Sequence, residues 1–137
     1  MGRKPKNEIK GNVTIEGGAN VWPHELHTAM ALANAGYNVR FIPASISLAS
    51  ADAYVDNTLF EFKSPEGASV KSIDNNLQKA LRRQSKNIVI DSFRVKNVQD
   101  RSILHFLEGR LRQKQGIRRL LFVTRDGKVI DINALVR

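Results

Sequence analysis

Apolar and polar residues follow different spacings in successive parts of the chain. In three segments, apolar residues recur every three or four positions, which predicts helices over residues 22–37, 70–85 and 100–116. Between them lie short apolar runs bounded by turn residues, which predict strands over residues 38–44, 52–57, 58–64, 86–93, 118–124 and 128–135. Residues 12–20 fit a short strand or a loop. This order predicts an α/β fold, a single domain with a mixed β-sheet flanked by helices.

The segment 70–85 separates its apolar residues from its basic ones. Ile73, Leu77 and Gln84 fall on one side of the expected helix, where Gln84 either packs in the core or faces a substrate. Four cations lie off this apolar side, within the segment or directly after it. We expect them to contact nucleic-acid phosphates: Lys79, Arg82, Arg83 and Lys86.

The strand expected over residues 58–64 carries charge where a half-buried strand has no structural need of it. Alternation commits Phe60 and Phe62 to the core and puts Glu61 and Lys63 together on the opposite face. The two charged residues are then about 6–7 Å apart along the strand. The bland interpretation is a solvated strand face with a salt bridge.

A second carboxylate is expected on the neighbouring strand of the same hairpin. Either Asp52 or Asp56 can be brought beside Glu61 by strand pairing. We favour Asp52, because Asp56-Asn57 has the composition of the hairpin turn itself.

Two carboxylates with an adjacent lysine have the chemistry of a phosphodiesterase. Carboxylate oxygens bind Mg²⁺ or Mn²⁺, which lowers the pKa of a bound water and neutralises a phosphate oxygen. The lysine positions the water or stabilises charge that develops on the phosphoryl group.

Charge and composition narrow the classes of protein further. The 137 residues carry a formal net charge of +9, which favours a polyanionic partner and above all nucleic acid. The chain has no cysteine, which excludes disulfides and thiolate metal sites. No apolar run is long enough to span a bilayer, and no signal-peptide core is present. Residues 1–11 are expected to be a basic flexible segment, followed by one domain over residues 12–137.

The pattern Asp52 … Glu61-Phe62-Lys63 resembles the signature of PD-(D/E)XK nucleases, the restriction-endonuclease-like superfamily. The resemblance implies a restriction-endonuclease-like core and a divalent metal held by Asp52 and Glu61. It also implies a further carboxylate from the first helix, which Glu25 matches, and a site-facing glutamine after the motif, matched by Gln78 or Gln84. The sequence departs from the pattern at Ala51, where the motif has proline.

The segments "GYNVRF", "DAYVDN", "FEFKSP" and "LQKALRRQSKNIVID" are also similar to toxin domains of contact-dependent growth inhibition and related polymorphic toxin systems. This resemblance implies a nuclease carried by a larger protein into the cytoplasm of a target bacterium. There it would cut tRNA or DNA unless an immunity protein, expected to be acidic, neutralises it.

Two other interpretations stay open. Some such toxins are metal-independent ribonucleases of barnase, EndoU, colicin or RelE type, for which His24, Lys63 and Ser64 would be the acid–base residues here. A nucleic-acid-binding module without catalysis is the other. His27 could also contact phosphate, and Asp91, at the end of a predicted strand, could join the site.

Overall fold

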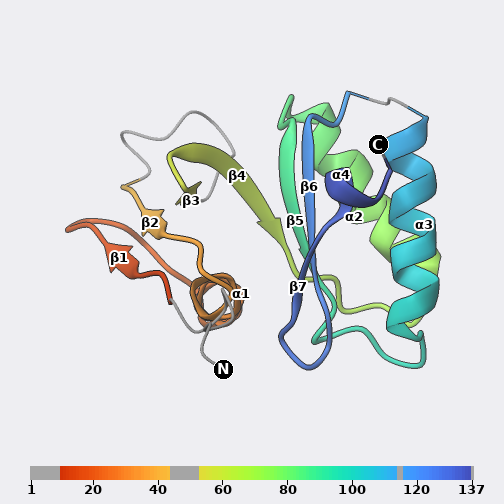
Figure 1. Ribbon diagram of the computed structural model, residues 1–137, viewed down its shortest axis with the longest axis horizontal. Coiled ribbons are helices and arrows are strands. Elements are labelled where there is room, and N and C mark those ends of the chain that lie inside the picture. The colour runs from red at the N-terminus through yellow and green to blue at the C-terminus, as the bar shows by residue number, and fades with distance from the viewer. Residues whose placement is uncertain (1–9, 44–52, 114–115, 137) are drawn as a thin grey trace, which may run out of the picture.

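The strands of the protein form one curled sheet whose order follows the chain (Figure 1). The computed structural model describes residues 10–43, 53–113 and 116–136. Within these residues the elements are β1 (Val13–Ile15), α1 (Pro23–Asn34), β2 (Val39–Phe41), β3 (Ala53–Val55), β4 (Thr58–Lys63), α2 (Val70–Arg82), β5 (Asn87–Asp91), α3 (Asp100–Arg112), β6 (Arg119–Val123), β7 (Val129–Asp131) and α4 (Ile132–Leu135). The α/β fold with a mixed sheet is confirmed.

The strand β4 joins the two halves of the sheet. Its first part pairs antiparallel with β3, where Phe60 lies opposite Ala53, and its last three residues pair in parallel with β5. The strand β5 is in turn parallel to β6. Because β4, β5 and β6 run the same way, their carboxyl ends lie at one edge of the sheet, which is where ligands bind in open α/β folds.

Helices cover both faces of the sheet. The helices α2 and α3 pack Ile73, Leu77 and Ile103 against one face, which includes Ile88 and Ile90 of β5. On the opposite face, α1 packs Ala29 and Leu32 into a second core with Phe60, Phe62 and Val89. The predicted alternation along β4 is therefore confirmed, since both phenylalanines lie in this second core.

Several predicted boundaries are corrected. The strand expected over residues 128–135 ends at Asp131, because the Asp131 side chain accepts a hydrogen bond from the Asn133 backbone and caps α4. Residues 12–20 do contain a strand, β1. The turn at Asp56-Asn57 is confirmed, with φ values of 47° and 69° that match the two-residue turns favoured in hairpins.

The end of α2 differs most from the prediction. The helix stops at Arg82, and Gln84 adopts a left-handed φ of 65° and is exposed. The Ser85 amide donates to the Ala80 carbonyl and the Gln84 amide to the Leu81 carbonyl, which is the Schellman arrangement of a helix end. The expectation that Gln84 lies on the apolar face of a continuing helix is wrong, because the chain reverses there.

A pair of glycine substitutions tests this helix end. Gln84→Gly is expected to raise the free energy of unfolding by roughly 0.5–1 kcal/mol, because glycine adopts the left-handed conformation without a Cβ penalty. The matched control Gln78→Gly, inside α2, is expected to lower it by about 1 kcal/mol. Urea denaturation followed by circular dichroism measures both, and equal signs for the two variants would contradict the assignment.

Candidate active site

A polar pocket of about 280 Å³ opens at the carboxyl end of β4. Four parts of the chain build it: the start of α1, the end of β4 with the residue after it, the helix α2 with its C-terminal turn, and the segment after β5. Its lining residues are Trp22, His24, Glu25, Glu61, Phe62, Lys63, Ser64, Asn76, Arg83 and Arg94.

Glu61 is the most buried charge in this pocket, with 1% of its side chain exposed. The Lys63 ammonium lies 2.9 Å from Glu61 Oε2, and Arg83 Nη1 donates to the same oxygen at 3.2 Å. The Ser85 hydroxyl donates to Oε1 at 2.6 Å. Both carboxylate oxygens are therefore held in place, with the negative charge set between two cations.

Local sequence explains how these groups converge. Alternation along β4 turns Glu61 and Lys63 to the face covered by α2, because Glu61 pairs with Ile88 of that face. The Schellman turn then places Arg83 and Ser85 directly after α2, where both reach Glu61. A buried ion pair is a weak source of stability compared with apolar packing, so its presence in a pocket favours a functional role.

Glu25 enters the pocket from the first turn of α1. Its Oε1 accepts a hydrogen bond from the Trp22 backbone amide at 3.0 Å, within a turn that begins with Pro23. The positive end of the helix dipole stabilises a carboxylate at this position. The capping role and a role in the site are therefore compatible for Glu25.

Ser64 and Arg94 complete the rim. Arg94 donates from Nε and Nη2 to the Ser64 carbonyl at 3.1 and 2.7 Å. The Ser64 hydroxyl is buried, and within the described part of the chain it has no hydrogen-bond partner. A buried hydroxyl of this kind normally has a partner, so Ser64 is able to hydrogen-bond a ligand in the pocket.

The pocket offers part of the ligand set that a divalent metal needs. Glu25 and Glu61 are hard oxygen ligands in one pocket, and the hydrogen bonds of Glu61 leave part of its acceptor capacity unused. Among residues 10–43, 53–113 and 116–136, no three histidine, cysteine or acidic side chains cluster closely enough to bind a metal. The described residues thus supply two carboxylate ligands for a metal, Glu25 and Glu61. The third predicted ligand, Asp52, lies outside the described residues.

Four of the predicted site residues share the pocket. They are Glu25, Glu61, Lys63 and Arg83. Arg83, which was predicted to contact phosphate, also donates to Glu61. Asp52 lies outside the described residues. The pocket is not lined by the other predicted residues, which are Gln84, Lys79, Arg82 and Lys86.

Asp56 and Gln78 have structural partners elsewhere. The Asp56 carboxylate accepts a hydrogen bond from the Asn38 amide at the tip of the β3–β4 hairpin. Gln78 donates to Asp74 within α2. Neither of them lines the pocket.

Sequence reasoning missed Ser85 and Arg94. Nothing in the local sequence marks Ser85, because its position depends on the reversal at Gln84. Arg94 follows β5 by three residues, and it reaches the pocket because β4 and β5 end at the same edge of the sheet.

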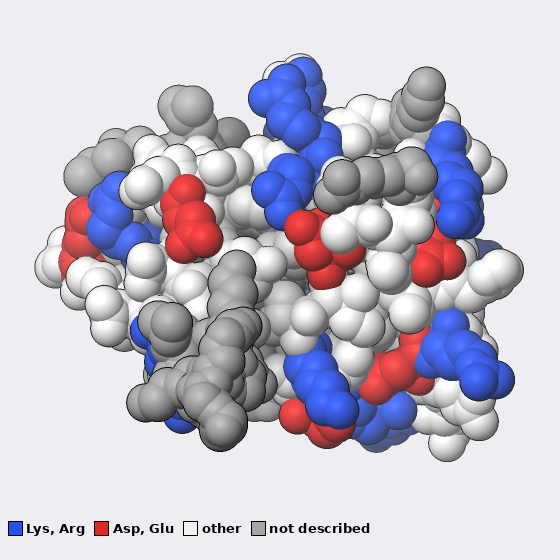
Figure 2. Space-filling model, in the orientation of Figure 1, with Lys and Arg blue, Asp and Glu red and all other residues white. Residues whose placement is uncertain are grey.

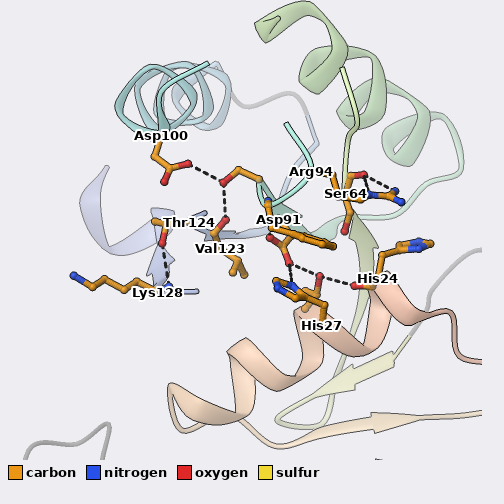
Figure 3. A network of polar contacts seen from close by, with 12 residues as sticks. His24, His27, Ser64, Asp91, Arg94, Asp100, Val123, Thr124 and Lys128 are labelled. Carbon is orange, nitrogen blue, oxygen red and sulfur yellow. Dashed lines mark hydrogen bonds and ion pairs between the residues drawn. The ribbon is translucent and has the colours of Figure 1, made fainter. Parts of the chain in front are cut away.

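A second polar cluster lies at the carboxyl end of β5 (Figure 3). Asp91 is fully buried, and its Oδ2 accepts a hydrogen bond from the Thr28 hydroxyl at 2.6 Å and lies 3.3 Å from His27 Nδ1. Its Oδ1 accepts from the Phe93 amide, and the Phe93 ring stacks on the His27 ring at 3.7 Å between centroids.

Surface charge is mixed. On the face shown in Figure 2, Lys and Arg side chains are interspersed with Asp and Glu and do not form one continuous basic surface. None of the described helices is long and apolar enough to cross a membrane.

Comparisons with known proteins point to one family. A family model described as "Contact-dependent growth inhibition CdiA C-terminal domain" matches residues 49–129, a segment that contains Glu61 and Lys63. A solved structure titled "CdiA-CT/CdiI toxin and immunity complex from Burkholderia pseudomallei" is similar, with a TM-score of 0.69 and 18% identity. The match covers 88% of this chain and 98% of that chain, and at this identity it shows a shared fold. No curated protein sequence matches the chain.

Removing the Ser85 hydroxyl tests the support of Glu61. Ser85→Ala is expected to lower the free energy of unfolding by about 1.5–3 kcal/mol, because it deletes a hydrogen bond to a buried charge. The control Ser102→Ala, on the exposed side of α3, is expected to change it by less than about 0.5 kcal/mol. The urea midpoints of the two variants report both changes. Equal midpoints for Ser85→Ala and Ser102→Ala would show that Ser85 does not stabilise Glu61.

Proposed function

The chain belongs to the contact-dependent growth inhibition CdiA C-terminal domain family, and we propose that this toxin domain is a metal-dependent nuclease. As a C-terminal domain of this kind, it is delivered into target cells as part of a larger protein. The observation that carries the proposal is the pocket itself, where Glu61 and Lys63 are held together beside Glu25, Ser64 and cationic side chains.

The pocket suits a phosphodiester better than a neutral substrate. Hydrolysis forms a bond from a water oxygen to phosphorus and breaks the bond to the leaving oxygen, so negative charge grows on the phosphoryl oxygens. Lys63, Arg83 and Arg94 all line the pocket, and cations fixed there stabilise that charge. The buried hydroxyl of Ser64 adds a neutral donor for a phosphate oxygen.

Magnesium or manganese is the proposed cofactor, held by Glu61 and Glu25 and, by the family pattern of the sequence, Asp52. When bound, such an ion lowers the pKa of water and neutralises phosphate charge. The chain's own contribution is to pair the Glu61 carboxylate with Lys63 and to orient it through Ser85.

A metal-independent ribonuclease is the second candidate, and one observation favours it. His24, Lys63 and Ser64 all line this same pocket, which brings an imidazole, an ammonium and a hydroxyl together. General acid–base cleavage of RNA uses groups of this kind. A binding module without catalysis is the remaining alternative.

The substrate proposed is tRNA or DNA in the cytoplasm of a target bacterium. We also propose that an acidic immunity protein neutralises the domain, supported by the net charge of +9 and by the toxin and immunity complex in the similar structure. Opposite net charges would accelerate this association, and screening by salt would slow it. Co-expression of the cognate immunity protein is expected to block both growth arrest and cleavage.

Cleavage assays on tRNA, single-stranded RNA and plasmid DNA test the proposal. In Mg²⁺, Glu61→Gln and Lys63→Ala are each expected to lower kcat/KM by roughly 100-fold or more, because each removes a charge at the reacting group. The controls Glu108→Gln on α3 and Lys71→Ala on α2 change the same charges away from the pocket and are expected to retain activity. Melting curves verify that each variant is folded.

EDTA separates the candidates. Loss of cutting in EDTA, with heat of Mn²⁺ binding that disappears in Glu61→Gln, supports the metal-dependent nuclease. Cutting that persists in EDTA and is lost in His24→Ala favours the metal-independent ribonuclease. Salt-sensitive binding without any cutting would leave the binding module.

A further inference from the structure

One aromatic side chain stands open to solvent at the rim of the pocket at the end of β4. Trp22 lines that pocket together with Glu61 and Lys63, and 59% of the residue is exposed. Tryptophan is strongly buried on average in folded proteins. The packing of the domain does not explain this position, because more than half of the residue's surface is left in water.

The backbone that carries this indole is fixed. The Trp22 amide donates to Glu25 Oε1 at 3.0 Å, and the Trp22 carbonyl accepts from the Leu26 amide at 3.0 Å. Pro23 follows directly, and Trp22 has the extended conformation that a residue before proline favours, with φ −80° and ψ 153°. The side chain is therefore presented to the pocket from a rigid helix start.

Trp22 also differs from the other aromatic residues in having an open face. Phe93 stacks on His27, and Arg40 lies over the Tyr54 ring at 4.5 Å. In the described part of the chain, Trp22 is the one aromatic residue among the exposed large apolar side chains. No ring or guanidinium of another described residue stacks on it. A flat ligand can therefore reach the indole.

The pocket beside Trp22 suits the phosphate of a nucleotide and leaves the base outside. Lys63, Arg83 and Arg94 supply positive charge for the phosphate. The volume of about 280 Å³ lies at the lower limit of pockets that enclose a whole small molecule. A nucleotide whose phosphate is bound at Lys63 therefore has its base at the rim, where Trp22 stands.

We propose that Trp22 is a substrate-contacting residue, which stacks on the base of the nucleotide whose phosphate is held in the Glu61 pocket. A base stacked on an indole is not paired within a double helix, so the substrate class is nucleic acid with an unpaired nucleotide at the site. Taking a base out of an intact duplex costs its stacking and pairing, which disfavours double-stranded DNA. The inference rests on the proposed nuclease function, whose substrate it narrows.

The fluorescence of Trp22 tests the contact directly, because the chain has one tryptophan. In the cleavage-deficient variant Glu61→Gln with EDTA, the probes are single strands of RNA and DNA of about 12 nucleotides and the duplexes of the same sequences. Single strands are expected to quench the emission, since a base stacked on an indole quenches it. Duplexes are expected to bind about 10-fold more weakly, measured by the anisotropy of labelled probes.

Substitutions at Trp22 separate stacking from charge. Trp22→Ala in the same background is expected to weaken binding of the single strand about 10-fold and to keep the slope of log K against log salt, because no phosphate contact is lost. Trp22→Phe keeps a ring and is expected to retain most of the affinity. The control Met30→Ala removes an exposed apolar side chain further along α1 and is expected to change neither quantity.

A fully abasic strand of the same length distinguishes the base contact from damage to the pocket. It keeps the phosphates, so it is expected to bind equally well with and without Trp22→Ala. Weaker binding of this strand in Trp22→Ala would show that the substitution disturbs the pocket itself and would overturn the inference. Melting curves verify that each variant is folded.

The inference and the nuclease proposal can fail separately. Unchanged affinity for the single strand in Trp22→Ala, or duplexes that bind as tightly as single strands, would overturn the stacking contact even if the wild type cleaves nucleic acid. Quenching by single strands without cleavage by the wild type would overturn hydrolysis and keep the contact. Failure of the wild type to bind any probe would overturn both.

Discussion

The carboxylate of Glu61 is held away from water between Lys63, Arg83 and Ser85, and the rest of the pocket depends on that arrangement. Desolvating one charge costs several kcal/mol, and removing one partner of a buried pair is expensive for the same reason. The partners come from β4 itself and from the turn after α2, so the helix must end where it does for the carboxylate to be satisfied. The end of α2 and the arrangement of the pocket around Glu61 therefore depend on each other.

The two clusters described here face opposite sides of the same sheet. Glu61 lies on the side covered by α2, whereas Asp91 alternates with Val89 and so faces α1. They are nevertheless neighbours, because both stand near the carboxyl ends of parallel strands. A sheet edge joins its two faces, and α1 reaches around that edge with His24 and His27. The fold thereby brings side chains from both faces of the sheet to one edge.

Alternation in the sequence was enough to predict β4, including the burial of Phe60 and the common face of Glu61 and Lys63, because a strand in a packed sheet has few other options. The contribution of Glu25 followed from a family resemblance, and the structure puts it in the same pocket. The fold class also followed, since strand and helix patterns alternate along the chain.

What could not be predicted depends on contacts between distant parts of the chain. The residue pattern around Gln84 predicts that the helix continues through it. In the structure Gln84 instead has a left-handed backbone, because Ser85 packs against Glu61 and the turn forms its own hydrogen bonds. His27 and Asp91 were separate candidates, because 64 positions part them and only the packing of α1 on β5 joins them. Arg94 has no periodicity at all to mark it.

The strand β4 has a further consequence as the one element that both halves of the sheet share. Its first residues pair with β3 and its last with β5, so neither half of the sheet can detach without releasing an edge of β4. Glu61 and Lys63 occupy the part that pairs with β5, directly after the part that pairs with β3. The part of β4 that carries Glu61 and Lys63 is therefore not a loop that unfolds locally. It unfolds only with the whole domain, so the geometry of the pocket is kept throughout the native state.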